Sequence, residues 1–93
     1  EIPIMLDSFA RQKIFDVLIG IGAVIRGETY HFEIVSDQSA NGLLHLQLNY
    51  HVPIINAIIT TNSSDEAFAR TKIKGEEAAL GAIEMAELVR KYD

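Results

Sequence analysis

The sequence predicts an α/β protein built on a parallel β-sheet. Two continuously apolar runs, residues 15–25 and 52–60, have the length and composition of strands buried on both faces. A segment with helical periodicity, residues 32–49, separates them, so the order is strand, helix, parallel strand. Further helical segments precede and follow this unit, and helices are therefore expected on both faces of the sheet.

Composition fits a small folded protein. Residues 1–93 are interpreted as one domain, because 48% of the 93 residues are hydrophobic and this length suits a single core. The formal net charge of −5 argues against nucleic acid as the main partner, since phosphate neutralisation needs clustered Lys and Arg. There is no cysteine and no apolar run of membrane-spanning length. We expect a cytoplasmic protein without a metal ion.

Two strands are few for a parallel sheet, which needs more strands and two covered faces to be stable. The chain opens Glu1-Ile2-Pro3, with no initiator Met and with residues that already resemble a helix start. We therefore expect this chain to be the C-terminal part of a longer polypeptide, with further strands upstream.

About four helices are predicted. Residues 2–13 and 32–49 each have an apolar stripe, and Gly42 is expected at a close packing contact. Ser63 with Glu66 forms a capping-box pattern that begins a short helix ending near Arg70. Residues 71–74 are interpreted as a connection to a long last helix, residues 75–91. Its expected buried stripe is Ala79, Ala82, Ile83, Ala86 and Val89.

The loop after the first strand is a candidate anion site. Gly27, Glu28 and Thr29 follow the strand end and lead into His31 and a helix. A loop that ends at a helix N-terminus offers unpaired backbone N–H groups and a partial positive charge, which suit phosphate. A histidine beside it can transfer protons near neutral pH. The alternative is an ordinary connection, and this segment alone favours that alternative.

Two cations follow the second strand and should lie at the same edge of the sheet. A guanidinium such as that of Arg70 suits bidentate phosphate binding, and an ammonium such as that of Lys74 binds phosphate or a carbonyl oxygen. Taken singly, each cation is better explained as complementing a helix dipole, but together with the loop and His31 the two favour an anion site. Asn56 interrupts the second strand and either bonds locally or faces a ligand.

At this point the sequence resembles the lumazine synthases over essentially its whole length. Residues 22–32 are similar to the family segment G-x-V-I-R-G-x-T-x-H-[FY], and residues 52–62 to its V-P-V-x-x-x-x-L-T-T segment. Residues 82–86 match its A-x-E-M-A run, and residues 1–3 look like the end of its G-A-F-E-[IL]-P motif. The resemblance implies a flavodoxin-like three-layer sandwich with a parallel sheet. This chain is expected to hold two strands of that sheet and to lack the N-terminal part of the domain.

The resemblance also implies an activity, the penultimate step of riboflavin biosynthesis. In that transferase reaction 5-amino-6-(D-ribitylamino)uracil condenses with 3,4-dihydroxy-2-butanone 4-phosphate to 6,7-dimethyl-8-ribityllumazine. It implies a homo-oligomer, either a pentamer or an icosahedral shell of pentamers, with active sites at subunit interfaces and with no metal or organic cofactor. Two alternatives are a non-catalytic flavin- or pyrimidine-binding scaffold and a riboflavin synthase of the related archaeal type.

By the same resemblance, His31 is the acid/base residue, and Arg70 binds the phosphate together with Gly27, Glu28 and Thr29. The residues implied in binding the pyrimidine and ribityl groups are Glu1, Ala23, Val24, Ile25, Asn56 and Lys74. Asn56 falls at a position that a neighbouring subunit contributes. An aromatic residue that stacks on the pyrimidine in the family is expected upstream of Glu1.

Overall fold

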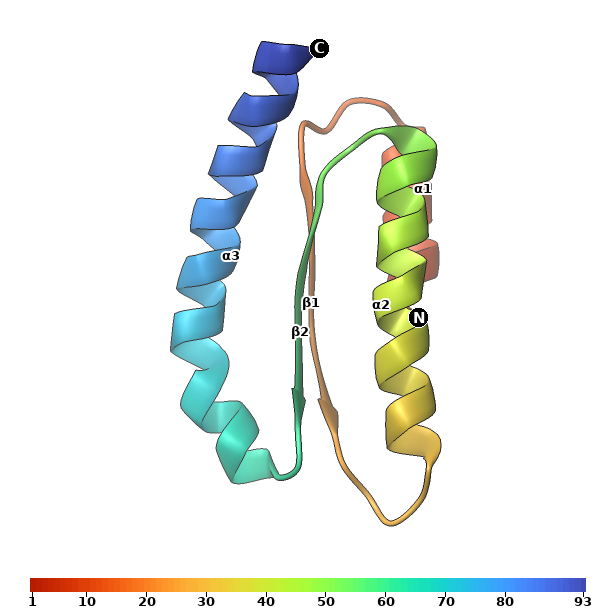
Figure 1. The fold of residues 1–93 in the computed structure, drawn as a ribbon, viewed down its shortest axis with the longest axis vertical. Helices are drawn as coiled ribbons and strands as arrows, with labels where there is room; N and C mark the ends of the chain where they lie inside the picture. Colours follow the sequence, from red (N-terminus) through yellow and green to blue (C-terminus); the bar gives the residue numbers. More distant parts are fainter.

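The computed structural model describes residues 1–93 and contains a two-stranded parallel sheet with three helices (Figure 1). β1 and β2 pair in register from Leu18 opposite Ile54 to Ile25 opposite Thr61. The predicted α/β class and the parallel pairing are confirmed, although both strands begin a few residues later than expected. The elements in chain order are α1 (Ile2–Arg11), β1 (Leu18–Ile25), α2 (His31–Tyr50), β2 (Ile54–Thr61) and α3 (Ser64–Tyr92).

The sheet lies between two helical layers, as in flavodoxin-like folds. Figure 1 shows α1 and α2 on one face and α3 on the other. The main core lies on the α1–α2 face, where the side chain of Leu43 is fully buried. A Cβ on Gly20 would come within 3.2 Å of Leu43, and one on Gly42 within 3.1 Å of Pro3. Both glycines therefore permit close packing, as the sequence indicated for Gly42.

The α3 face is covered less completely, because α3 packs mainly against β2. Ile21 of β1 is 71% exposed on this face, so the prediction that the first strand is buried on both sides is wrong for this chain. The buried stripe of α3 also differs from the predicted one. Ala78 and Ala82 are buried, whereas Ala79 and Ile83 are exposed. Large apolar side chains thus remain uncovered on the α3 side of the molecule.

The last two predicted helices are one continuous helix, which makes three helices rather than four. Its start is as predicted, since the Ser63 hydroxyl accepts a hydrogen bond from the backbone N–H of Glu66 at 3.2 Å. Residues 71–74 are helical, and the Thr71 hydroxyl donates to the backbone carbonyl of Phe68 at 3.0 Å. Gly75 continues the helix with open space around it. Arg70 and Lys74 therefore lie on consecutive turns of one rigid element.

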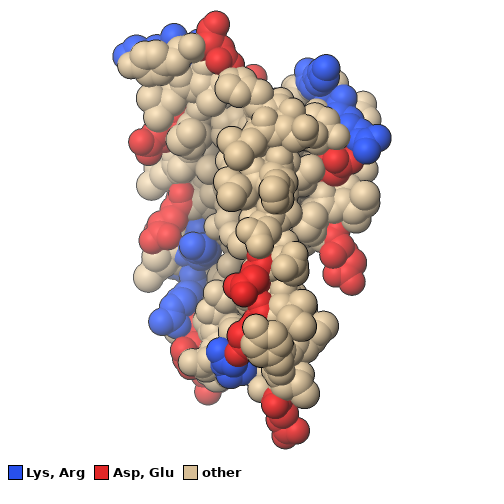
Figure 2. Space-filling model, turned by 45° about the vertical axis from the view of Figure 1, so that its right-hand side comes forward, with Lys and Arg blue, Asp and Glu red and all other residues tan.

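The charged surface has no dominant basic region on the face shown in Figure 2, where Lys and Arg are dispersed among Asp and Glu around a broad uncharged area. None of the three helices combines the length and the apolar character needed to cross a bilayer.

Candidate functional site

The loop from Arg26 to Tyr30 is exposed at the carboxyl end of the sheet. Its first residue is fixed, because the backbone N–H of Arg26 donates to the carbonyl of Thr61 at 2.9 Å and extends the strand pairing by one step. The backbone N–H groups of residues 27–30 donate to no acceptor in the chain. A run of free donors thus stands directly before α2, where the helix dipole favours negative charge.

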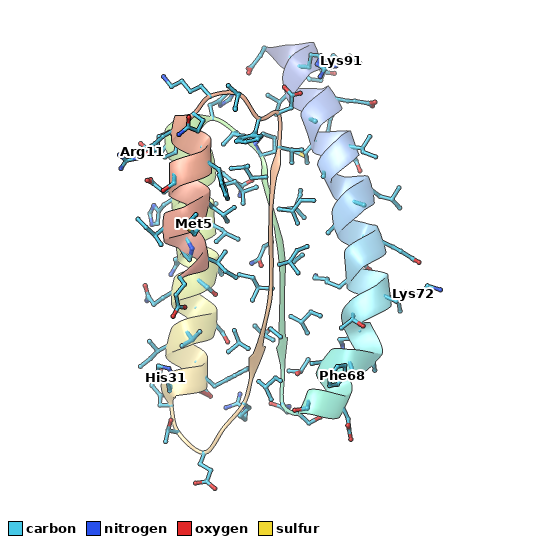
Figure 3. The ribbon with its side chains drawn as sticks, turned by 180° about the vertical axis from the view of Figure 1, so that it is seen from behind. Met5, Arg11, His31, Phe68, Lys72 and Lys91 are labelled. Atoms are coloured by element: carbon cyan, nitrogen blue, oxygen red, sulfur yellow. The ribbon has the colours of Figure 1, made fainter.

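His31 is the first residue of α2 and is exposed to solvent. Its backbone N–H donates to the Thr29 hydroxyl at 3.3 Å, and its imidazole forms no hydrogen bond or ion pair. Figure 3 places His31 at the same end of the molecule as Phe68 in the first turns of α3. An unpaired, accessible imidazole beside a set of free N–H donors is able to exchange protons with a bound anion.

Arg70 and Lys74 line a common cavity on the α3 side of the sheet. A cavity of about 410 Å³ between β2 and α3 is lined by Thr60 and both cations. Lys74 is half-buried and lines two neighbouring cavities as well. One, of about 350 Å³, includes Ala23, and the other, of about 200 Å³, includes Asn56. Lys74 therefore shares a cavity with each of three other predicted site residues, which are Arg70, Ala23 and Asn56.

Asn56 is bonded locally. It is exposed on β2, and its side-chain oxygen accepts from the backbone N–H of Ile58 at 3.0 Å. Of the two roles that the sequence left open, this contact supplies the local one within a single chain. The amide nitrogen of Asn56 donates to no group in the chain.

The predicted site residues do not come together within one chain. None of residues 27–31 lines the cavities that hold Arg70 and Lys74, since the loop leads into α2 and the cations belong to α3. The Arg70 guanidinium is largely exposed and donates to the carbonyl of Glu66 at 3.2 Å. Glu1 lines a separate cavity of about 280 Å³ beside Ile19. A single chain therefore does not close one pocket around all of these groups.

The side chain of Arg26, for which the sequence predicted no role, joins three segments at this end. Its Nε donates to the side-chain oxygen of Asn62 at 2.8 Å, and its Nη1 forms an ion pair with Glu33. The guanidinium carbon lies 4.3 Å from the ring centre of Phe32. The hydrogen bond from Arg26 lowers the pKa of Glu33 below its ordinary 4.5. The one feature of the sequence that could have indicated this role is an isolated Arg directly after an apolar strand.

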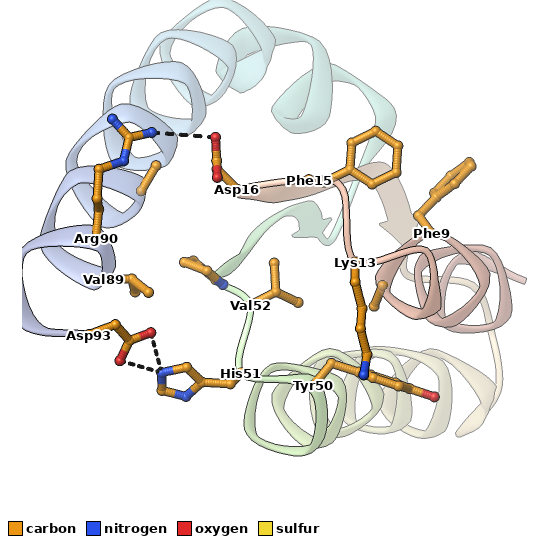
Figure 4. Close-up of a pocket in the computed structure, with 13 residues that line it drawn as sticks. Phe9, Lys13, Phe15, Asp16, Tyr50, His51, Val52, Val89, Arg90 and Asp93 are labelled. Carbon is orange, nitrogen blue, oxygen red and sulfur yellow. Dashed lines mark hydrogen bonds and ion pairs between the residues drawn. The ribbon is translucent and has the colours of Figure 1, made fainter.

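The opposite end of the sheet contains a different cavity, of about 330 Å³ (Figure 4). Most of its charged side chains pair with one another, whereas Lys13 forms no ion pair. His51 lies 3.0 Å from the carboxylate of Asp93, and Arg90 lies 3.5 Å from that of Asp16. None of the predicted site residues lines this cavity. No three His, Asp or Glu side chains anywhere in the chain converge in a way that could hold a metal ion.

Comparison with known proteins identifies the family. The family model described as 6,7-dimethyl-8-ribityllumazine synthase matches residues 1–90. The chain belongs to this family. A relative of that name from Nitrosospira multiformis is 58% identical over 93 residues, which are 100% of this chain and 58% of the relative.

Two further relatives with this name have a similar coverage. That of Nitrosomonas europaea is 53% identical over 100% of this chain and 57% of the relative. That of Burkholderia multivorans is 50% identical over 100% of this chain and 54% of the relative. The chain thus spans somewhat more than half the length of these curated relatives. The family match includes every predicted site residue, from Glu1 to Lys74.

Proposed function

We propose that the protein to which this chain belongs is a lumazine synthase. It condenses 5-amino-6-(D-ribitylamino)uracil with 3,4-dihydroxy-2-butanone 4-phosphate to 6,7-dimethyl-8-ribityllumazine, with release of phosphate and water. The observation that carries the proposal is the run of free N–H donors at residues 27–30 beside the unpaired imidazole of His31, in a chain that belongs to this family. This reaction requires a phosphate-binding site next to a residue that can transfer protons.

In this proposal, the donors of Gly27, Glu28 and Thr29 bind the phosphate of the butanone, and Arg70 adds a bidentate guanidinium. The amine of the uracil attacks the ketone carbonyl, and water leaves as the imine forms. Phosphate then departs from the four-carbon unit, and the second amine closes the ring with loss of water. His31 supplies and removes protons at the oxygen and carbon atoms that change in these steps. Positioning and anion binding supply the rest of the rate enhancement.

The second substrate binds across the strand ends. Ala23, Val24 and Ile25 offer backbone groups to the pyrimidine, Lys74 contacts its carbonyl oxygen, and Glu1 contacts the ribityl chain. Because the loop and the cations share no cavity within one chain, we place the complete site between subunits. The loop of one subunit then faces Arg70, Lys74 and Asn56 of a neighbour, where the free amide nitrogen of Asn56 is available to substrate.

The assembly is proposed to be a homo-oligomer, either a pentamer or an icosahedral shell of pentamers, in the cytoplasm. The exposed apolar side chains on the α3 side support it, since large uncovered apolar areas mark surfaces that bind other protein segments. We also propose that residues upstream of Glu1 supply further strands to the same domain. The length of the relatives, of which this chain covers 54–58%, supports that extension.

Absorbance-monitored formation of the lumazine from the two substrates tests the proposal on the full-length protein. Product formation that depends on both substrates is expected. Binding of the uracil or of a flavin without turnover would instead favour a non-catalytic scaffold. Supplying the lumazine and detecting riboflavin would favour a riboflavin synthase of the archaeal type. No metal or organic cofactor is added, because the proposed steps need only proton transfer and anion binding.

A further inference from the structure

We propose that Arg26 is a positioning residue that fixes the loop of residues 27–30 and the imidazole of His31 against the end of β2. This inference rests on the proposed function, because it assigns Arg26 to the site formed by that loop.

The contacts of Arg26 reach three segments at once. Its Nε bonds to Asn62, directly after β2, at 2.8 Å, and its Nη1 pairs with Glu33 in the first turn of α2. Its guanidinium carbon lies over the ring of Phe32, 4.3 Å from the ring centre. With the backbone bond to Thr61 at 2.9 Å, this one residue ties the end of β1 to the end of β2 and to the start of α2.

The loop has little else to hold it. Residues 27–30 make no backbone hydrogen bond through their N–H groups, and the Thr29 hydroxyl contributes one weak contact at 3.3 Å. Phe32 and Glu33 immediately follow His31 in α2, so fixing them fixes the backbone that carries the imidazole. Lysine has no planar group with donors in several directions, so it cannot make these contacts together.

The positive charge of Arg26 is balanced within the chain by the carboxylate of Glu33. Glu33 pairs with it, and the other carboxylate oxygen of Glu33 is enclosed and accepts no hydrogen bond. The pairing lowers the pKa of Glu33, so the carboxylate stays ionised through the neutral range. Arg26 therefore acts as a tether rather than as a further phosphate ligand, in contrast to Arg70, whose guanidinium is largely exposed.

The test compares Arg26→Gln and Arg26→Lys with a matched control, Arg11→Gln, in the full-length protein. Arg11 is also paired with one carboxylate, Asp7 at 2.7 Å, but lies on α1 away from the loop. For Arg26→Gln we expect kcat to fall about 10- to 100-fold and KM for the butanone phosphate to rise several-fold, because small misplacements of reacting groups have large kinetic effects. Arg26→Lys should be intermediate, and Arg11→Gln within about twofold of wild type.

If Arg26 only stabilised the fold, Arg26→Gln would change stability and not substrate binding. It would lower the melting temperature and the fraction of active protein, while KM stays at the wild-type value. Wild-type kcat and KM in Arg26→Gln, or a loss of activity that only follows the loss of folded protein, would overturn the proposal.

Hydrogen exchange separates this inference from the proposed function. The backbone N–H groups of Glu33 and Ile34 donate to the carbonyl of Tyr30 at 3.1 and 3.3 Å, and they report on the first turn of α2. Their exchange should accelerate in Arg26→Gln and not in Arg11→Gln. If wild type forms no lumazine, the proposed function fails, yet this comparison still decides whether Arg26 holds the turn. Unchanged exchange would overturn the positioning role.

Discussion

The two ends of the sheet contain similar kinds of polar group but use them differently. At the amino end, His51 pairs with Asp93 at 3.0 Å and Arg90 pairs with Asp16 at 3.5 Å, so these groups connect helices and loops to one another. At the carboxyl end, the imidazole of His31 and the N–H groups of residues 27–30 have no acceptor or partner in the chain. Polar groups that are held in place and left unpaired are available to a ligand. The unpaired groups of the loop and of His31 are therefore what favours the carboxyl end as the proposed site.

The largest difference between the two ends is expected when the histidine at each end is replaced by alanine in a separate variant. His31→Ala should lower kcat for lumazine formation by about 10²- to 10⁴-fold, the contribution typical of a general acid/base. His51→Ala removes an exposed pair at the other end and should leave kcat within about twofold of wild type. Steady-state kinetics on the full-length protein measures both. Unchanged turnover in His31→Ala would remove this residue from the mechanism.

The arginines provide the next comparison. Arg70→Ala should raise KM for the butanone phosphate about 10- to 100-fold, because a hydrogen bond to a charged group contributes roughly 1.5–3 kcal/mol. Arg90→Ala, which loses only the exposed pair with Asp16, should leave KM unchanged. Varying the butanone phosphate at a saturating concentration of the uracil gives both values. An equal effect of the two variants would contradict a phosphate role for Arg70.

α3 joins the two ends, and its continuity can be tested with glycines. Gly75→Ala should raise the free energy of unfolding by about 0.5–1 kcal/mol, because Gly75 is in a helix interior with open space around it. Gly22→Ala should change it less, since a Cβ there would lie 2.9 Å from the terminal methyl of Ile2, the flexible end of a side chain that can shift. Urea unfolding monitored by circular dichroism measures both. Destabilisation by Gly75→Ala would indicate a break in the helix near residues 71–74.

The smallest expected effect is a pH dependence at the carboxyl end. Arg26 lowers the pKa of Glu33 from its ordinary 4.5, so this pair contributes stability above pH 4.5, which is lost as pH falls through the lowered pKa. Glu33→Gln should therefore melt at a lower temperature than wild type near pH 7, with a difference that shrinks at acidic pH. Melting temperatures across this range measure it. A difference that grows toward acidic pH would contradict the sign of the shift.

Much of the fold could be predicted from local patterns. The two apolar runs, the helix between them and the cap at Ser63 with Glu66 were all identified correctly. The connection at residues 71–74 was not, because Gly75 and the preceding polar residues resemble a helix end. The helix continues there because about 1 kcal/mol for one glycine is small beside the packing of a 29-residue helix on the sheet.

Tertiary contacts account for what the sequence could not provide. Arg26 meets Asn62 across 36 residues and Glu33 across seven, and no periodicity encodes such a cluster. The exposure of Ile21 was likewise missed, because an apolar strand gives no information about whether a second layer covers it within this chain. Motif and spacing predicted a site at residues 27–30 and His31, but only the structure shows that these residues share no cavity with Lys74 within one chain.

The most direct measurement is hydrogen exchange of the full-length protein with and without the butanone phosphate, with inorganic phosphate as a second probe. We expect slower exchange in the peptide that contains residues 27–30, because a bound phosphate would accept hydrogen bonds from these free N–H groups. The peptide around His51, at the opposite end, should not change. Slower exchange around His51, or none at residues 27–30, would contradict the assignment of the site to the carboxyl end of the sheet.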